Sequence, residues 1–156
     1  MTRGASRDRV TARLAQLRGV YEGFDIQQTT LGVGPEEFER VCGEGNSAVR
    51  AEVTVTDPRG RHLLVETADG WSLPGTDVSA GEPITETLRE AVARQTGLEP
   101  VIETVEAAAI VAIDCEATGE STYQLQVRFA ATPGEGTLDE AAAWRAEPTE
   151  VFRSRL

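Results

Sequence analysis

The sequence WSLPGTDVSAGEP at residues 71–83, continued by ITETLREAVARQTGL at residues 84–98, decides the fold of this chain. Pro83 is tolerated in the first turn of a helix, and Glu82 and Glu86 favour the positive end of the helix dipole. One stripe of the following helix is apolar and consists of Ile84, Leu88, Ala91 and Val92. Gly97 is typical of the residue that ends a helix. These residues predict a loop followed by an amphipathic helix that packs on a sheet.

The loop and helix together resemble the Nudix box, the loop-helix-loop of Nudix hydrolases. The pattern of that family is G-x5-E-x7-R-E-U-x-E-E-x-G-U, where U is aliphatic, and it usually follows an aromatic-x-L-P-G segment. Residues 71–75 match the opening segment, Gly81 and Glu82 follow at the expected distance, and residues 96–98 match the end without insertion or deletion. The resemblance implies an α/β fold, namely a Nudix-like α/β/α sandwich with a mixed β-sheet.

The remaining sequence agrees with such a domain from residue 46 to residue 156. Val49, Ala51, Val53 and Val55 alternate with polar residues, which predicts a strand. Later segments predict strands at 62–67, 101–114 (one bent strand or two), 123–129 and 141–146, and a terminal helix at 148–156. Residues 1–45 lie outside the resemblance and predict an N-terminal helical extension with helices at 7–21 and 35–42. The extension either packs on the main domain or serves in dimerisation.

The residues that carry the chemistry of a Nudix hydrolase are mostly different here. Such a site needs several carboxylates, because Mg²⁺ and Mn²⁺ take oxygen ligands and neutralise the developing phosphate charge. Without gaps, the leading glycine of the pattern falls on Thr76, the first glutamate on Glu82, the arginine on Glu90, the next glutamate on Ala91, and the glutamate pair on Arg94 and Gln95. A shift of one residue would align Arg89 and Glu90 with the Arg-Glu step, but it supplies at most one more acid. Glu82 is therefore the one acid of the box expected in a catalytic or metal-binding role.

Two arginines of the same helix are candidate ligand-binding residues. Arg94, together with Arg89 or Arg50, could bind the phosphate oxygens of a nucleoside diphosphate directly and bidentately, without a metal and without cleavage. The alternative is that Arg94 is a solvated helix residue or pairs with Glu90, four residues before it. The sequence leaves both alternatives open.

The other candidate groups are aromatic side chains and thiols. Trp71 and Trp144, with Tyr123, could stack on a base, and the alternative is that they lie in the core. Cys42 and Cys115 are far apart in the sequence, with no further cysteine near either, and we expect both to behave as small buried hydrophobic residues. A cysteine- or histidine-rich metal site is therefore not expected.

The charge of the chain is strongly acidic, with 26 acids against 15 bases and a net charge of -11. Every base is arginine, which resembles a halophilic, haloarchaeal protein, although a GC-rich genome also favours arginine codons. In about 1 M salt the Debye length is about 3 Å, so the acidic surface does not bar an anionic nucleotide there. Nucleic-acid binding through a broad basic face is not expected. No long apolar segment and no secretory signal are visible, so we expect a cytoplasmic protein without a membrane span.

We interpret the sequence as a Nudix-family protein with a degenerate motif, a non-hydrolysing or weakly active module. It would bind a nucleotide, a nucleoside diphosphate derivative or a protein, including a second copy of itself. The alternative is an active metal-dependent Nudix hydrolase that recruits ligands from outside the box, such as Glu135, Asp139 or Glu140. Only that hydrolase would need Mg²⁺ or Mn²⁺ as cofactor. A third interpretation is a structural subunit that assembles through its N-terminal helices, so whether the chain is an enzyme stays open at this point.

Overall fold

Two β-sheets and three helices make up the computed structural model, which describes residues 3–43, 49–68, 70–79 and 81–146. The helices are α1 (Arg3–Val20), α2 (Pro35–Gly43) and α3 (Ile84–Thr96). The strands are β1 (Ile26–Val33), β2 (Val49–Val55), β3 (His62–Thr67), β4 (Gly70–Ser72), β5 (Gly75–Val78), β6 (Val101–Cys115), β7 (Ser121–Thr132) and β8 (Ala142–Arg145). None of the described helices is long and apolar enough to cross a membrane.

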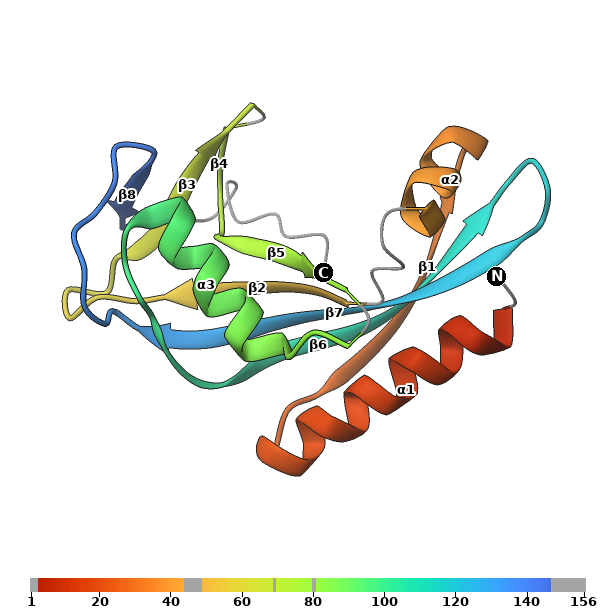
Figure 1. Cartoon of the computed structure of the whole chain (residues 1–156), viewed down its shortest axis with the longest axis horizontal. Coiled ribbons are helices and arrows are strands. Elements are labelled where there is room, and N and C mark those ends of the chain that lie inside the picture. Colours follow the sequence, from red (N-terminus) through yellow and green to blue (C-terminus); the bar gives the residue numbers. More distant parts are fainter. Residues whose placement is uncertain (1–2, 44–48, 69, 80, 147–156) are drawn as a thin grey trace.

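The larger sheet is mixed and has the strand order β1-β6-β7-β2-β5 (Figure 1). β6 and β7 form a long antiparallel hairpin, while β1 pairs with β6 and β2 pairs with β7 in parallel. β5 closes the other side of the sheet by antiparallel pairing with β2. The smaller sheet is antiparallel and has the order β4-β3-β8. This mixed sheet with its helices confirms the expected α/β class.

Alternating residues of β2 and β7 supply the main core. The β2–β7 register places Val49, Ala51 and Val53 beside Leu125, Val127 and Phe129, all of them fully buried. α3 packs against this core through Leu88 and Val92. α1 packs against it through Leu17, and the ring of Tyr21, directly after α1, meets Phe129 edge-on with the ring centroids 5.8 Å apart. Both helices therefore cover the same face of the sheet.

The opposite face of the sheet has a second, smaller core under α2. Phe38 of α2 packs there with alternate residues of β6, namely Ala109, Val111, Ile113 and Cys115. These β6 residues lie beside β7 residues on the face that points away from α1 and α3. The N-terminal segment thus contributes one helix to each face of the larger sheet, α1 to one face and α2 to the other.

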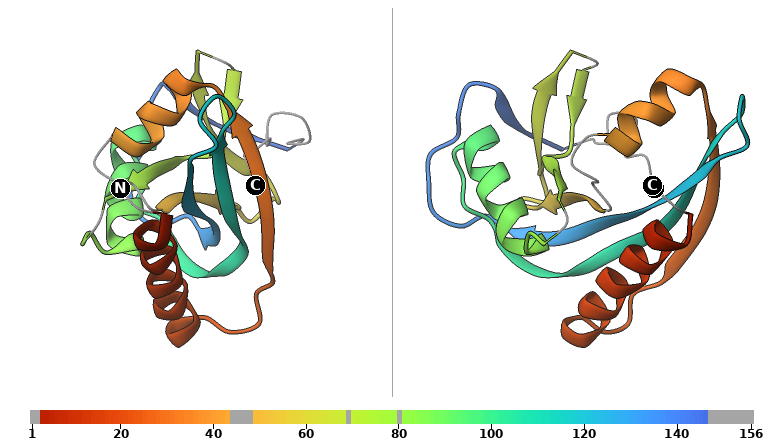
Figure 2. Two further views of the ribbon diagram at one scale, coloured as in Figure 1. Left: turned by 90° about the vertical axis from the view of Figure 1, so that its right-hand side faces the viewer. Right: turned by 45° about the vertical axis from the view of Figure 1, so that its right-hand side comes forward.

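The structure corrects the expectation for residues 1–45 in one respect. Both expected helices are present as α1 and α2, but residues 26–33 between them form β1, which the prediction omitted. Six of the eight residues of β1 are exposed, so the strand lacks the apolar alternation that would reveal it. Residues 101–115 form one bent strand, β6 (Figure 2). Its pairing with β7 shifts between Ile102 and Thr104 and again after Val105. The terminal helix expected at 148–156 lies outside the described residues.

Candidate functional site

Two glycines of the box determine how α3 joins the sheet. Gly75 begins β5 beside β2, and a Cβ atom there would lie 2.7 Å from the carbonyl oxygen of Ala51. Gly97 follows α3 with φ of 83°, and its N–H donates to the carbonyl oxygen of Ala93 at 2.9 Å. A Cβ atom on Gly97 would collide with the carbonyl oxygen of Thr137. Both positions therefore need glycine for the backbone itself, and these parts of the motif reflect the fold rather than the chemistry.

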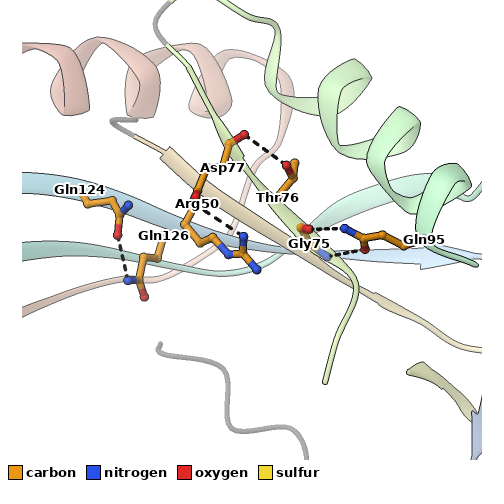
Figure 3. Close-up of polar contacts among 7 residues, drawn as sticks. All are labelled: Arg50, Gly75, Thr76, Asp77, Gln95, Gln124 and Gln126. Atoms are coloured by element: carbon orange, nitrogen blue, oxygen red, sulfur yellow. Dashed lines mark hydrogen bonds and ion pairs between the residues drawn. The ribbon is translucent and has the colours of Figure 1, made fainter. Parts of the chain in front are cut away.

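Gln95 binds the backbone of Gly75 across the junction between α3 and β5 (Figure 3). Its Nε2 donates to the Gly75 carbonyl oxygen at 2.8 Å, and its Oε1 accepts from the Gly75 N–H at 3.3 Å. A carboxamide suits this peptide group because it offers one donor and one acceptor. A carboxylate would instead face the carbonyl with a second acceptor, and a cation or a proton would have to lie between the two oxygens. Where the Nudix pattern has the second glutamate of its pair, this chain has a side chain that fastens α3 to β5.

Ala91 and Arg94 occupy the other two positions at which the helix of the Nudix pattern has a glutamate, and neither side chain offers an oxygen ligand. Ala91 lies one turn before Gln95 on the same side of α3 and is 1% exposed. Arg94 is exposed and carries a positive charge. Within the part of the chain that the structure describes, no three histidine, cysteine, aspartate or glutamate side chains are grouped so as to hold a metal ion. Because Mg²⁺ and Mn²⁺ prefer several oxygen ligands, the residues at these positions do not fit either ion.

Glu82, the acid of the box that matches the pattern, closes the loop between β5 and α3. Its carboxylate accepts from the N–H of Ser79 at 2.8 Å, and its own N–H donates to the carbonyl oxygen of Ser79 at 3.1 Å. The guanidinium of Arg13 on α1 donates to the same carbonyl oxygen at 3.0 Å. Glu82 therefore helps to fix the conformation of the loop between β5 and α3, which Arg13 also binds from α1. The catalytic or metal-binding role of Glu82 stays a prediction.

The two candidate arginines lie together in an open groove on the outer side of α3. The groove has a volume of 510 Å³ and is lined by Glu86, Arg89, Glu90, Ala93, Arg94 and Glu99. Arg89 and Arg94 are both exposed, so an anion in solution can reach their guanidinium groups. The three glutamates repel an anion, so this groove can accept one only through the two arginines.

Trp71 and Trp144 lie on opposite faces of the smaller sheet and do not form one pocket. Trp71 is opposite Glu66 and Trp144 is opposite Leu63, and residues three apart in a strand point to opposite faces. The guanidinium of Arg145 lies over the ring of Trp71, 4.6 Å from its centroid. Trp144 packs against the main core. Stacking of one base between the two tryptophans would therefore require the smaller sheet to rearrange.

A polar cluster on β2 and β7 was not predicted from the sequence. It lies on the face of the sheet that points away from α1 and α3, because its residues alternate with the core residues of β2 and β7. Figure 3 shows two of its members, Gln124 and Gln126. Arg128 donates from two nitrogens to one carboxylate oxygen of Glu52, at 3.2 and 3.3 Å, and Glu52 is only 9% exposed. Gln126 donates to Oε1 of Gln124 at 3.2 Å, and its own Oε1 is buried without a hydrogen-bond partner among the described residues. Polar alternation marks these positions as one face of each strand, but it gives no signal that the face is covered.

One carboxyl group with a shifted pKa lies in the turn between β2 and β3. Oδ1 of Asp57 accepts from the N–H groups of Arg59 and Arg61 at 3.0 and 2.8 Å, and Oδ2 accepts from Nε of Arg61 at 2.8 Å. Burial raises the pKa of Asp57, but these hydrogen bonds and the charge of Arg61 outweigh it and hold the pKa below the ordinary value of 3.8. No candidate ligand-binding residue lies in this turn, so the shift bears on stability.

Comparisons with known proteins define the fold of this chain. No model of a protein family and no curated protein matches the sequence. Among solved structures the chain is similar to the mutator MutT protein from Bacillus halodurans, at 24% identity and a TM-score of 0.50, over 67% of this chain and 72% of that one. It is also similar to a Nudix hydrolase from Nitrosomonas europaea, at 21% identity and a TM-score of 0.49, over 69% and 80% of the two chains. The mixed sheet, the helix of the box and the similarity to the Bacillus structure together define a Nudix-like fold.

Proposed function

We propose that this protein is a Nudix-fold module that binds a nucleoside diphosphate derivative without a metal and does not hydrolyse it. The observation that carries the proposal is the pair of hydrogen bonds between Gln95 and Gly75. With Gln95 bound to the backbone, Ala91 buried and Arg94 cationic, these positions of α3 offer no carboxylate to Mg²⁺ or Mn²⁺. Without such an ion the site lacks the group that would activate water and offset the charge that develops on a diphosphate during cleavage.

The arginines of α3 support a diphosphate as the ligand class. A guanidinium group binds phosphate oxygens in pairs through charge-assisted hydrogen bonds. Arg89 and Arg94 line the same groove and are both exposed. The net charge of -11 slows the approach of an anion in dilute buffer, and about 1 M salt screens this repulsion. Binding should therefore be measured in molar KCl.

The proposal is tested by hydrolysis of a mixed panel in molar KCl, with Mg²⁺ or Mn²⁺ and in parallel with EDTA. The panel contains ADP-ribose, NADH, dinucleoside polyphosphates and nucleoside triphosphates. We expect no metal-dependent release of a mononucleotide from protein shown to be folded by circular dichroism. We also expect calorimetry in EDTA to detect binding of at least one panel member. Metal-dependent release of a mononucleotide would contradict the proposal.

Arg94→Ala and Arg59→Ala form a matched pair for the binding groove. Both variants remove an exposed arginine, but Arg59 lies in the turn between β2 and β3 and does not line the groove on α3. We expect Arg94→Ala to weaken binding about tenfold or more, because charge-assisted hydrogen bonds to phosphate are lost. Arg59→Ala should leave the affinity within about twofold. Equal affinities in the two variants would exclude a role for Arg94 in binding.

The alternative function, a metal-dependent hydrolase with ligands from outside the box, has one observation in its favour. The loop between β7 and β8 is fastened to the end of α3, since the N–H of Asp139 donates to the last residue of α3 at 2.7 Å and Leu98 pairs with Gly136. The acids of this loop therefore lie near the C-terminal end of α3. For that hydrolase, Glu135→Gln or Asp139→Asn would remove metal-dependent turnover, and Glu103→Gln on β6 would leave it unchanged.

A further inference from the structure

β1 is the outermost strand of the larger sheet, at the margin opposite β5 (Figure 2). It pairs with β6 over all eight of its residues, so its backbone is held in an extended conformation. Residues 27–32 are all exposed. A paired edge strand turns part of its N–H and C=O groups outward, where they are available to another strand. β1 is therefore a preformed template for strand pairing.

The other strand edges carry features that block such pairing. β5 has only four residues and includes the exposed Asp77. The first half of β6 extends beyond β1 and carries Glu103 and Glu106. β4 and β8 have three and four residues, and β8 ends at Arg145. Short strands and charged side chains are common means by which proteins prevent edge-to-edge association.

β1 has none of these features. Its sequence, IQQTTLGV, contains no charged residue and no proline, although 26% of the residues of the whole chain are charged. It includes Leu31, which is 51% exposed and is one of three large hydrophobic side chains exposed among the described residues. Within the part of the chain that the structure describes, the one long edge of the larger sheet that is open to pairing is thus also uncharged.

We propose that β1 pairs with β1 of a second copy of this chain, antiparallel about a two-fold axis, so that the two larger sheets become continuous. Such pairing is closed, because each copy uses its open edge and the short, charged β5 edges do not extend the sheet further. The residues of β1 fit a second copy of the same strand. Within residues 26–33 two copies place no like charges opposite one another, and these residues offer no ion-pair partner to a charged peptide.

The pairing of β1 with β6 restricts which residues meet in the dimer. Leu31 is opposite Ile113, which packs under α2, so the odd-numbered residues of β1 lie on the α2 face. A two-fold axis perpendicular to the sheet keeps this face on the same side in both copies. Leu31 therefore meets one odd-numbered residue of the second copy, from the set Gln27, Thr29, Leu31 and Val33. Each of these contacts removes apolar surface of Leu31 from water.

Salt strengthens this dimer. Asp25 directly precedes β1, and the side chain of Glu116 lies beside Gly32 near the other end of the strand. Antiparallel pairing brings Asp25 of one copy toward Glu116 of the second, and each copy also carries a net charge of -11. Because salt screens these repulsions and does not affect the uncharged strand contacts, dilute buffer favours the monomer. A dimer held by ion pairs would respond to salt in the opposite direction.

Sedimentation velocity of the full chain tests the proposal, over about 1 to 200 µM protein in about 0.1 M and about 2 M KCl. We expect a concentration-dependent dimer in the concentrated salt and a dissociation constant about tenfold or more higher in the dilute salt. Hydrogen exchange should show that the amides of residues 26–33 become more protected as the protein concentration rises. A monomer whose β1 amides exchange equally fast at every concentration would overturn the proposal and leave the edge to a different polypeptide.

Two variants and a matched control localise the interface. Leu31→Glu and Thr29→Glu place a charge opposite the second copy, and each should raise the dissociation constant about tenfold or more. Val101→Glu changes another exposed hydrophobic residue, 55% exposed on β6, and should leave it within about twofold. Circular dichroism confirms that each variant is folded. A dimer that neither β1 variant weakens would show that another surface makes the contact and would overturn the proposal.

Discussion

Gln95→Glu returns to α3 the carboxylate that the Nudix pattern has at this position, and it tests whether the junction is built around an amide. In the native chain Nε2 of Gln95 donates to the Gly75 carbonyl oxygen at 2.8 Å, and Oε1 accepts from the Gly75 N–H at 3.3 Å. A carboxylate keeps the second interaction and turns the first into a contact between two acceptors. The substitution changes few atoms, so its effect reports mainly on this contact.

The loss of one hydrogen bond and the unfavourable acceptor contact in a half-buried site should lower the free energy of unfolding by about 1–3 kcal/mol. For a chain of this length each kcal/mol corresponds to a change of about 2–4 °C in Tm. Mg²⁺ or Mn²⁺ between the two oxygens of the variant should recover part of the loss, because a ligand that binds only the folded state raises its stability. The wild-type protein should show no such recovery, since its Gln95 amide already donates to the carbonyl.

Urea denaturation followed by tryptophan fluorescence measures this effect, with EDTA and with Mg²⁺ in parallel samples. Gln124→Glu is the matched control, because Oε1 of Gln124 accepts from Gln126 at 3.2 Å and a carboxylate at this position still accepts. We expect the control to lie within about 0.5 kcal/mol of the wild type. Equal stability of Gln95→Glu and the wild type in EDTA would refute the conclusion that the amide holds α3 to β5.

Three further predictions concern the backbone and the charges around the site. Gly97→Ala, at φ of 83° with a backbone collision, should lower the free energy of unfolding by about 2–4 kcal/mol in urea titrations, whereas Gly119→Ala, at φ of 76° in open space, should lower it by about 1 kcal/mol. Arg128→Met should lower it by about 1–3 kcal/mol because Glu52, only 9% exposed, loses its cationic partner, and the Glu52→Leu double variant should recover most of this loss. The stability from Asp57 is present above its unfolded-state pKa and is lost as the pH falls through its lower folded-state pKa, so Asp57→Asn should flatten the stability profile at pH values below the ordinary pKa of 3.8.

The sequence alone was sufficient to predict the helices and strands that bury one side and expose the other. The alternation in β2 and β7, the apolar stripe of α3 and its terminal Gly97 each predict the observed element. β1 was missed because most of its residues are exposed, so it has no apolar period, and its place in the sheet depends on pairing with β6, far away in the sequence. The burial of Glu52 was missed for a related reason, since alternation separates the two faces of a strand without saying what covers each.

The candidate site could be read only in part from the sequence. Arg89 and Arg94 share one helix but lie five residues apart, about 140° around the helix axis, so the sequence alone does not place them side by side. The structure places both in one groove. The sequence also shows that Gln95 is not glutamate. Its bonds to Gly75 depend on the approach of β5 to α3, which is a property of tertiary packing. The faces of the tryptophans depend in the same way on the register of β3 with its neighbours.

The most direct test of the central claim is a ³¹P NMR titration of ADP-ribose, or of whichever panel member binds, with the wild-type protein in molar KCl. The diphosphate resonances report binding, and new monophosphate resonances report cleavage in the same sample. We expect the diphosphate resonances to shift or broaden with protein in EDTA, and no monophosphate resonance to grow after Mg²⁺ is added. Monophosphate resonances that grow only with Mg²⁺, or diphosphate resonances that the protein never perturbs, would contradict metal-independent binding without hydrolysis.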